Sequence, residues 1–177
     1  MLISTNILRD ENLDFDYVVT DNAQGIFDSI NSSNRSAQKC FNLIGSYGTG
    51  KSSFLLAFEQ TLRGTKLFFD RPLKKTENSP RFIKLIGKPS SIKTELSKAL
   101  KLPKNSSLEK ILSELDKKSE FYPEVYILVD ELGKFIEYAL TNNPKEETYV
   151  FQRLAEYIND PSKNIFWIGT LHQNIDR

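Results

Sequence analysis

The most informative residues of this sequence are Gly45-Ser46-Tyr47-Gly48-Thr49-Gly50-Lys51-Ser52. It satisfies the pattern G-x-x-x-x-G-K-S/T at every defined position. The glycines allow backbone conformations that place successive N–H groups around phosphate oxygens. Lys51 is then expected to reach the β- and γ-phosphates, and the Ser52 hydroxyl to bind Mg²⁺. We therefore predict a nucleotide-binding loop that runs from Gly45 to Ser53.

The residues on either side of this loop supply the context that the motif requires. An apolar segment, 40–44, is expected to form a strand before the loop, and 51–63 a helix after it. Within that helix the apolar residues recur at helical spacing, and Gly64 stands where a glycine commonly ends a helix. The alternative is a glycine-rich turn that only joins a strand to a helix. A strand, a loop and an amphipathic helix in this order favour phosphate binding.

The rest of the chain alternates between short apolar runs and amphipathic segments. The runs predicted to be strands are 66–69, 82–86, 125–129 and 165–168. The segments predicted to be helices are 92–100, 108–115, 132–140 and 150–158. The polar residues 70–81 include prolines and are expected to form a loop. Strands separated by helices predict a three-layer α/β domain with a mainly parallel central sheet. With the G-x-x-x-x-G-K-S/T loop between its first strand and helix, this arrangement is typical of a P-loop NTPase fold.

An acidic pair follows the run 125–129, which has the composition of a strand buried on both faces. Asp130, at the carboxyl end of that strand, is predicted to hold Mg²⁺ through its water shell. Glu131 is predicted to orient and polarise the attacking water. The alternative is that both acids favour the start of a helix, and the two roles are compatible. Because ligands of open parallel sheets lie beyond the carboxyl ends of strands, the pair and the loop should converge on one crevice.

The acidic pair also bears on the choice of nucleotide. Residues 130–133 fit D-x-x-G, a signature of GTPases, but the chain contains no N-K-x-D that would read guanine. ATP is therefore the expected nucleotide, and GTP the minor option.

Polar residues follow the last predicted strand and are candidates for sensing the γ-phosphate. Thr170 comes first, and His172 and Gln173 lie behind it. The alternative for each is a solvated or locally hydrogen-bonded side chain. Before the first strand, residues Tyr17 to Val19 are candidates to border the base.

The amino-acid composition excludes several classes of function. The 177 residues include 24 Lys and Arg against 23 Asp and Glu, and a net charge of +1 supplies no basic field for nucleic acid. One cysteine and one histidine exclude a disulfide framework and metal clusters built on those residues. No apolar run approaches the ~18 residues of a membrane span, and the N-terminus lacks a secretory signal pattern. We therefore expect a cytoplasmic protein without a membrane partner.

With these residues in view, the chain resembles P-loop ATPases of the division that has an additional strand between the Walker motifs and a catalytic glutamate. Within that division it is most similar to AAA+ and STAND-like ATPases. Three stretches, 45–53, 127–138 and 169–173, also resemble uncharacterised bacterial ATP-binding proteins, some of them associated with defence against phage.

The resemblance implies an ATPase whose cofactors are ATP and Mg²⁺. Its catalytic residues would be Lys51, Glu131 and Thr170, and its metal ligands Ser52 and Asp130. Hydrolysis would be coupled to a conformational change in a larger assembly. Two alternatives stay open: a nucleotide-binding switch or assembly module with negligible turnover, and a P-loop phosphotransferase.

The domain organisation is predicted from the same resemblance. Residues 1–177 are expected to form one P-loop ATPase domain, in which 1–37 border the nucleotide and 38–177 form the nucleotide-binding core. An AAA+ module continues past the strand that carries Thr170 into a fifth strand, an arginine finger and a helical lid. We therefore expect an N-terminal piece of a longer protein, with its remaining domains and a second copy of the chain as partners. A nucleic-acid partner stays open, although the net charge of +1 does not support it.

Overall fold

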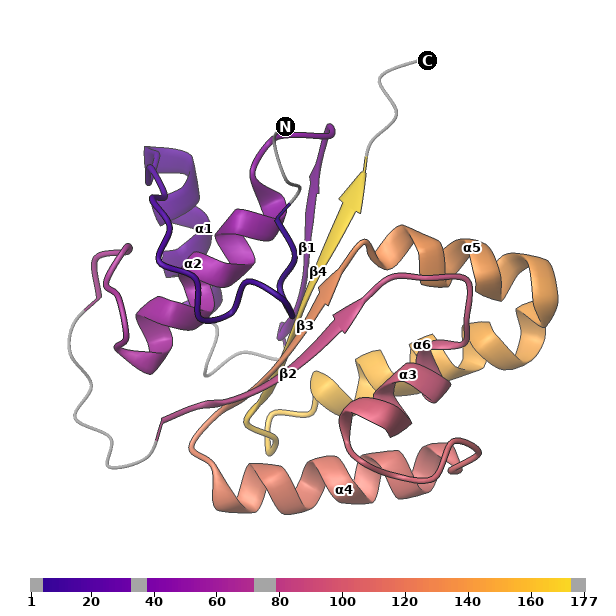
Figure 1. The fold of residues 1–177 in the computed structure, drawn as a ribbon. Coiled ribbons are helices and arrows are strands. Elements are labelled where there is room, and N and C mark those ends of the chain that lie inside the picture. Colours follow the sequence, from indigo (N-terminus) through magenta and orange to yellow (C-terminus); the bar gives the residue numbers. More distant parts are fainter. Residues whose placement is uncertain (1–4, 33–37, 72–78, 173–177) are drawn as a thin grey trace.

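The computed structural model describes residues 5–32, 38–71 and 79–172, and its centre is a parallel sheet (Figure 1). The strands are β1 (Cys40–Gly45), β2 (Arg81–Ile86), β3 (Val125–Asp130) and β4 (Ile165–His172). All three neighbouring pairs are parallel, and the order across the sheet is β1-β4-β3-β2. The strand that precedes the phosphate loop and the strand that ends in the acidic pair are therefore separated by β4. This is the additional strand that the resemblance predicts.

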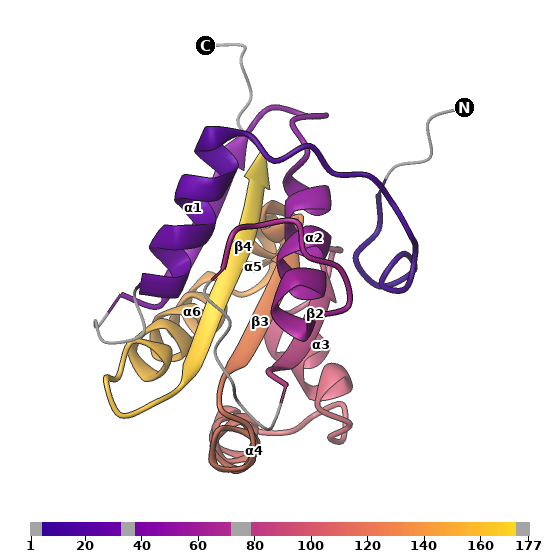
Figure 2. The ribbon, with the colours of Figure 1, turned by 90° about the vertical axis from the view of Figure 1, so that its left-hand side faces the viewer.

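Helices cover both faces of the sheet (Figures 1 and 2). One face carries α1 (Asp21–Ser32) and α2 (Lys51–Arg63). The other carries α3 (Ile92–Ala99), α4 (Leu108–Phe121), α5 (Leu132–Asn142) and α6 (Pro144–Ile158). The three-layer α/β fold with a mainly parallel sheet is confirmed.

The central strand β3 divides the core into two apolar clusters. It is buried along its whole length, as the near-continuous apolar run predicts. Ile127 and Val129 face the cluster under α3 to α6, while Tyr126 and Leu128 face the cluster under α1 and α2. Successive side chains of a strand point to opposite faces, so one short run holds both layers onto the sheet.

The prediction of a strand at 66–69 is wrong. In the structure these residues form an irregular connection after α2. The backbone N–H of Phe68 donates to Thr61 Oγ1 at 3.1 Å instead of joining a sheet ladder. The ring of Phe69 is buried and stacks on Phe27 with 4.5 Å between ring centroids. The apolar residues of this segment therefore belong to a loop whose aromatic rings pack into the core. In the sequence, a short apolar run of this kind cannot be distinguished from a short strand.

Helix α1 is an element that the sequence analysis missed. Its buried residues are Ala23, Phe27 and Ile30, which recur at helical spacing. Thr20 caps its first turn, because Thr20 Oγ1 accepts a hydrogen bond from the N–H of Ala23 at 3.2 Å. Both signals were present in the sequence before the first strand.

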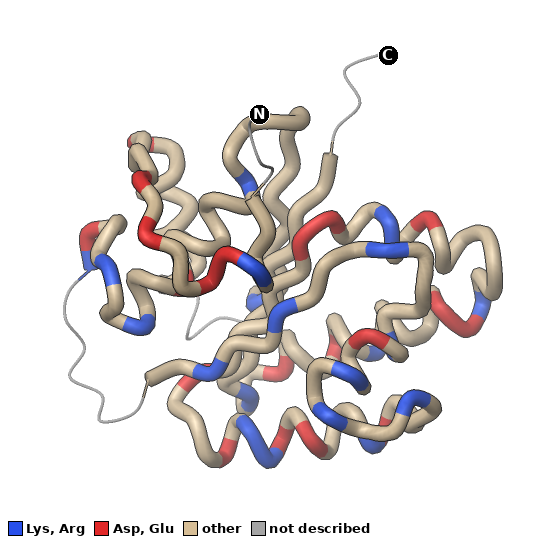
Figure 3. The backbone as a smooth tube through the Cα atoms, viewed as in Figure 1, with Lys and Arg blue, Asp and Glu red and all other residues tan. Residues whose placement is uncertain are grey.

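Figure 3 shows that residues of both charges are interspersed along the described backbone rather than separated by sign. Along α4, for example, Glu114 pairs with both Lys117 and Lys118. This arrangement agrees with the near-zero net charge. Within the described ranges, no helix is both long and apolar enough to cross a lipid bilayer.

Candidate nucleotide-binding site

The phosphate loop joins β1 to α2, and its shape depends on two glycines. Gly48 and Gly50 have φ angles of 76° and 81°, in the left-handed region that a residue with a side chain rarely adopts. Gly50 is also the residue before α2, and no side chain caps that helix. The free N–H groups of the first turn of α2 are therefore available to an anion at the loop.

Lys51 lies folded back over the loop that it belongs to. Its Nζ donates to the carbonyl oxygens of Gly45 at 2.7 Å and Ser46 at 2.6 Å. Burial lowers the pKa of Lys51, while the nearby carboxylate of Asp130 raises it. The lysine therefore braces the loop, and it is near enough to Asp130 for the two charges to interact.

The two serines that follow Lys51 lie at the start of α2. Both are partly buried, and Ser53 Oγ lies 3.3 Å from Thr5 Oγ1 of the N-terminal segment. Thr49 Oγ1 donates to the Ser46 carbonyl at 2.9 Å and so closes the turn of the loop.

Asp130 and Thr170 meet at the carboxyl ends of neighbouring strands. Thr170 Oγ1 donates to Asp130 Oδ1 at 2.7 Å, and both side chains are buried. The backbone N–H of Glu131 donates to both, at 2.9 Å to Thr170 Oγ1 and at 3.1 Å to Asp130 Oδ1. In this structure the Thr170 hydroxyl therefore orients Asp130, and its contact with a γ-phosphate stays a prediction.

Glu131 stands in a strained backbone conformation between β3 and α5. Its φ of 54° and ψ of 42° are left-handed, which is uncommon for a residue other than glycine. The space is provided by Gly87, where an added Cβ would lie 1.9 Å from the Glu131 carbonyl oxygen. The backbone N–H of Gly87 donates to the Asp130 carbonyl at 2.7 Å. The loop after β2 thus fixes the position of the acidic pair.

The carboxylate of Glu131 is engaged by a lysine one helical turn later. Lys134 Nζ forms an ion pair with Glu131 Oε2, and this hydrogen bond is the main reason that the pKa of Lys134 is raised. Both side chains are partly exposed, so either partner has room to move. The sequence analysis missed this pair, although a lysine three residues after a glutamate at a helix start indicates such an ion pair.

His172 contacts the phosphate loop by ring stacking. Its imidazole lies over the ring of Tyr47, with 3.8 Å between centroids and 13° between planes. Its Nδ1 is buried and has no hydrogen-bond partner in the described part of the chain. Gln173 lies outside the described residues. The contact between Tyr47 and His172 joins the loop to the end of β4, and the sequence analysis did not foresee it.

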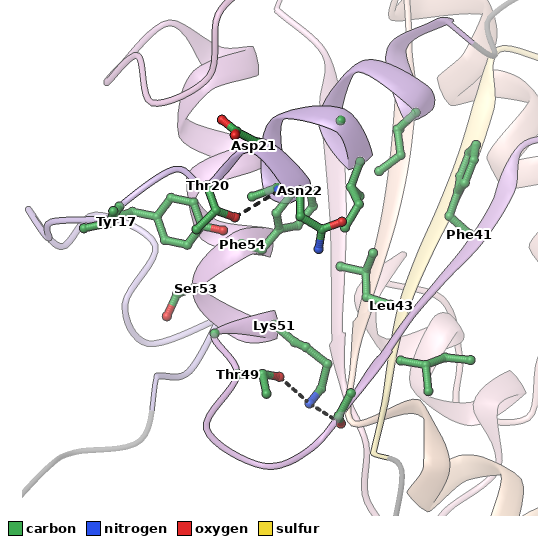
Figure 4. Close-up of a pocket in the computed structure, with 18 of the residues that line it drawn as sticks. Tyr17, Thr20, Asp21, Asn22, Phe41, Leu43, Thr49, Lys51, Ser53 and Phe54 are labelled. Carbon is green, nitrogen blue, oxygen red and sulfur yellow. Dashed lines mark hydrogen bonds between the residues drawn. The ribbon is translucent and has the colours of Figure 1, made fainter.

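A cavity of about 1120 Å³ extends from the phosphate loop along α1, from Asp21 to Ile30 (Figure 4). Phe41 and Leu43 of β1 form one of its walls. Tyr17 and Val18 line it as well, whereas Val19 packs against the apolar core. The N-terminal segment therefore borders the same space as the phosphate loop.

The chemistry of these groups fits a magnesium nucleoside triphosphate. A hydroxyl and a carboxylate, Ser52 and Asp130, are hard oxygen ligands of the kind that Mg²⁺ prefers. The positive-φ glycines shape a loop of N–H groups, and Lys51 supplies a cation beside it.

Comparison with known proteins identifies the fold. No protein-family model and no curated protein sequence matches the chain. Among solved structures, the Aeropyrum pernix ORC2 protein, determined as ADPNP–ADP complexes, matches with a TM-score of 0.59 at 13% identity, over 90% of this chain and 44% of that one. C. elegans PCH-2 matches with a TM-score of 0.51 at 13% identity, over 90% of this chain and 40% of that one. The chain thus shares the three-layer α/β fold of these two structures, with its mainly parallel sheet, and spans less than half the length of either protein.

Proposed function

We propose that this chain is a nucleotide-binding module that binds Mg-ATP and hydrolyses it, coupling hydrolysis to conformational change in a larger assembly. The observation that carries the proposal is that the Lys51 loop and the Asp130–Thr170 pair follow the carboxyl ends of neighbouring parallel strands, with the Lys51 loop lining a large cavity. The fold supports it, since one structural neighbour was determined with bound nucleotides.

Each residue then has a defined task. Loop N–H groups and Lys51 hold the phosphates, and Ser52 and Asp130 hold Mg²⁺, which neutralises charge on the transferred phosphoryl group. Thr170 keeps the Asp130 carboxylate oriented. Glu131 accepts a proton from the attacking water once its carboxylate has left Lys134.

A second function, a nucleotide-binding switch with negligible turnover, is favoured by one observation. The Glu131 carboxylate is already engaged by Lys134, so the group that would activate water is occupied. The remaining domains and a second copy of the chain are the partners that either function would use.

The first experiment measures Mg-ATP affinity in Lys51→Ala. Loss of the lysine cation should abolish detectable Mg-ATP binding, because the loop then lacks the positive charge that binds the phosphates. Lys145→Ala is the matched control, since Lys145 is exposed on α6 and does not line the cavity. If a folded Lys51→Ala protein binds Mg-ATP as the parent does, the proposal is wrong.

The second experiment separates hydrolysis from switching. Glu131→Gln removes the charge and keeps the size, so ATP affinity should persist while turnover falls on the order of 10²-fold. Turnover that is negligible in the parent, with intact ATP binding, would instead establish the switch.

A further inference from the structure

One pair of rings joins the end of β4 to the tip of the phosphate loop. The imidazole of His172 lies over the ring of Tyr47, with 3.8 Å between their centroids. In the described part of the chain this is the only ring contact of Tyr47, a residue that is 74% exposed. Aromatic pairs contribute more than the area that they bury. The contact is therefore able to restrain a loop tip that is otherwise open to solvent.

The two rings reach the cavity only through the loop. Gly48 and Lys51 line the cavity of about 1120 Å³, whereas Tyr47 and His172 do not. His172 lies opposite Gly45 in the register of β1 and β4, at the point where β1 ends and the loop begins (Figure 1). The connection from His172 to the cavity therefore runs through Tyr47 and the backbone of the loop.

The loop has reason to need such a restraint, because two of its residues are glycines with positive φ. Gly48 and Gly50 have φ angles of 76° and 81°, and glycine populates other backbone regions as readily. The phosphate-binding shape is thus one of several that the segment can adopt. A contact that holds this shape before the ligand arrives raises affinity, because less ordering remains to be done on binding.

The hydrogen bonds of the loop do not replace this contact. Lys51 Nζ donates to the carbonyl oxygens of Gly45 and Ser46, but the proposed function requires the lysine to turn to the phosphates. Thr49 Oγ1 donates to the Ser46 carbonyl at 2.9 Å, and this bond lies within the loop and does not join it to the sheet. The stacked rings can stay in contact while a nucleotide is bound.

A lysine near Tyr47 is the other candidate for holding the loop tip. The hydrogen bond to Glu131 is the main cause of the raised pKa of Lys134, and the charge interaction with Tyr47 is a lesser one. Within the described residues no hydrogen bond joins Lys134 to Tyr47, and the lysine is engaged by Glu131. Removal of the Tyr47 hydroxyl alone tests this alternative separately from the ring.

We propose that His172 is a positioning residue for nucleotide binding, which acts through Tyr47 and holds the phosphate loop in its binding shape. This inference rests on the proposed binding of Mg-ATP at the loop. It gives His172 a role different from the predicted contact with the γ-phosphate. The N–H groups of such a loop surround the α- and β-phosphates, which ATP and ADP share. Both nucleotides should therefore depend on the stacked rings equally.

The test measures the affinities of Mg-ATP and Mg-ADP in the parent, in His172→Leu, in Tyr47→Leu and in the variant that carries both changes. Leucine is an apolar side chain without a ring. Each single change should lower both affinities by the same factor, about twofold to tenfold, which is the range of one aromatic pair. The double variant should bind no more weakly than either single variant, because both changes remove the same contact.

Three further variants separate the rings from the other properties of these side chains. His172→Phe keeps a flat ring without nitrogen atoms and should restore both affinities that His172→Leu loses. Tyr47→Phe removes only the hydroxyl and should restore what Tyr47→Leu loses. Tyr149→Leu is the matched control, since Tyr149 is an exposed tyrosine on α6 that does not line the cavity, and it should leave both affinities unchanged.

The outcomes distinguish this role from the alternatives. A loss confined to Mg-ATP, or one that His172→Phe does not restore, would show that the imidazole acts on the nucleotide directly and overturns the inference. A Tyr47→Phe variant as weak as Tyr47→Leu would assign the restraint to the hydroxyl and Lys134, and overturns it too. So do losses that add in the double variant, or unchanged affinities in both single variants. All of these results leave the proposed function standing, whereas a parent that binds neither nucleotide overturns the proposed function and the inference together.

Discussion

Thr170 Oγ1 donates a hydrogen bond to Asp130 Oδ1 at 2.7 Å, and both residues are buried at the sheet edge. Parallel register produces this contact, because Val129 lies opposite Gly169 and the next residue of each strand is Asp130 and Thr170. The same oxygen accepts a longer bond, at 3.1 Å, from the backbone N–H of Glu131, so the Thr170 hydroxyl is the nearer of its two donors.

Thr170→Val should therefore weaken the site without changing its shape. The substitution keeps the volume and leaves Asp130 Oδ1 without its hydroxyl donor, which costs about 1–3 kcal/mol of unfolding free energy. Mg-ATP affinity should fall as well, since Asp130 is the expected metal ligand. Urea denaturation and nucleotide titration at several Mg²⁺ concentrations measure the two effects. Thr170→Ser, which keeps the hydroxyl, should restore both, and a valine variant as stable and as Mg²⁺-responsive as the parent would contradict this role.

The ion pair between Lys134 and Glu131 leads to a prediction of higher activity rather than a weaker site. Lys134→Gln should raise the turnover of Mg-ATP about fivefold, because an exposed pair worth about 1 kcal/mol no longer restrains the carboxylate. Stability should change by less than about 1 kcal/mol for the same reason. Steady-state turnover and thermal denaturation are the two measurements.

The matched control for Lys134 is a second lysine at the same spacing. Lys117 pairs with Glu114 at 3.3 Å on α4, away from the cavity. Lys117→Gln should leave turnover unchanged. A fall in turnover in Lys134→Gln would show that the lysine assists the reaction instead of restraining Glu131.

Local patterns were sufficient to predict the parts of the site that lie on single segments. The phosphate loop requires particular residues at fixed spacing. The run 125–129 is apolar throughout because both of its faces are buried. From these two patterns we predicted the parallel sheet, and with it the position of the phosphate loop and the acidic pair at the same end of neighbouring strands.

Features that depend on partners distant in the sequence could not be predicted in this way. Residues 66–69 have the pattern of a strand, but their N–H groups bond to Thr61 and their rings fill a gap beside α1. The stacking of Tyr47 on His172 likewise depends on the register of β1 and β4. Nothing within one segment encodes either contact.

Gly87 provides the last prediction, because it lies against the strained residue of the site. An added Cβ would be 1.9 Å from the carbonyl oxygen of Glu131 and 2.7 Å from its carbonyl carbon. Those atoms belong to the backbone, so relief requires movement of the loop after β2 or of the acidic pair. Gly87→Ala should cost about 1–3 kcal/mol of unfolding free energy, in the range of other overpacked sites. Turnover should fall because Glu131 is displaced from its position beside Asp130.

Gly133→Ala is the matched control, two residues after Glu131 on α5. There an added Cβ would meet only Leu171 Cδ2 at 3.9 Å, an ordinary contact distance. Alanine is the better helix former by up to about 1 kcal/mol, so this variant should be at least as stable as the parent and equally active. Denaturation curves and ATP turnover of the two variants, measured side by side, decide the matter. If Gly87→Ala and Gly133→Ala behave alike, the close approach of Gly87 does not hold Glu131 in place, and its strained backbone must be maintained by the hydrogen bonds to Asp130 and Thr170 alone.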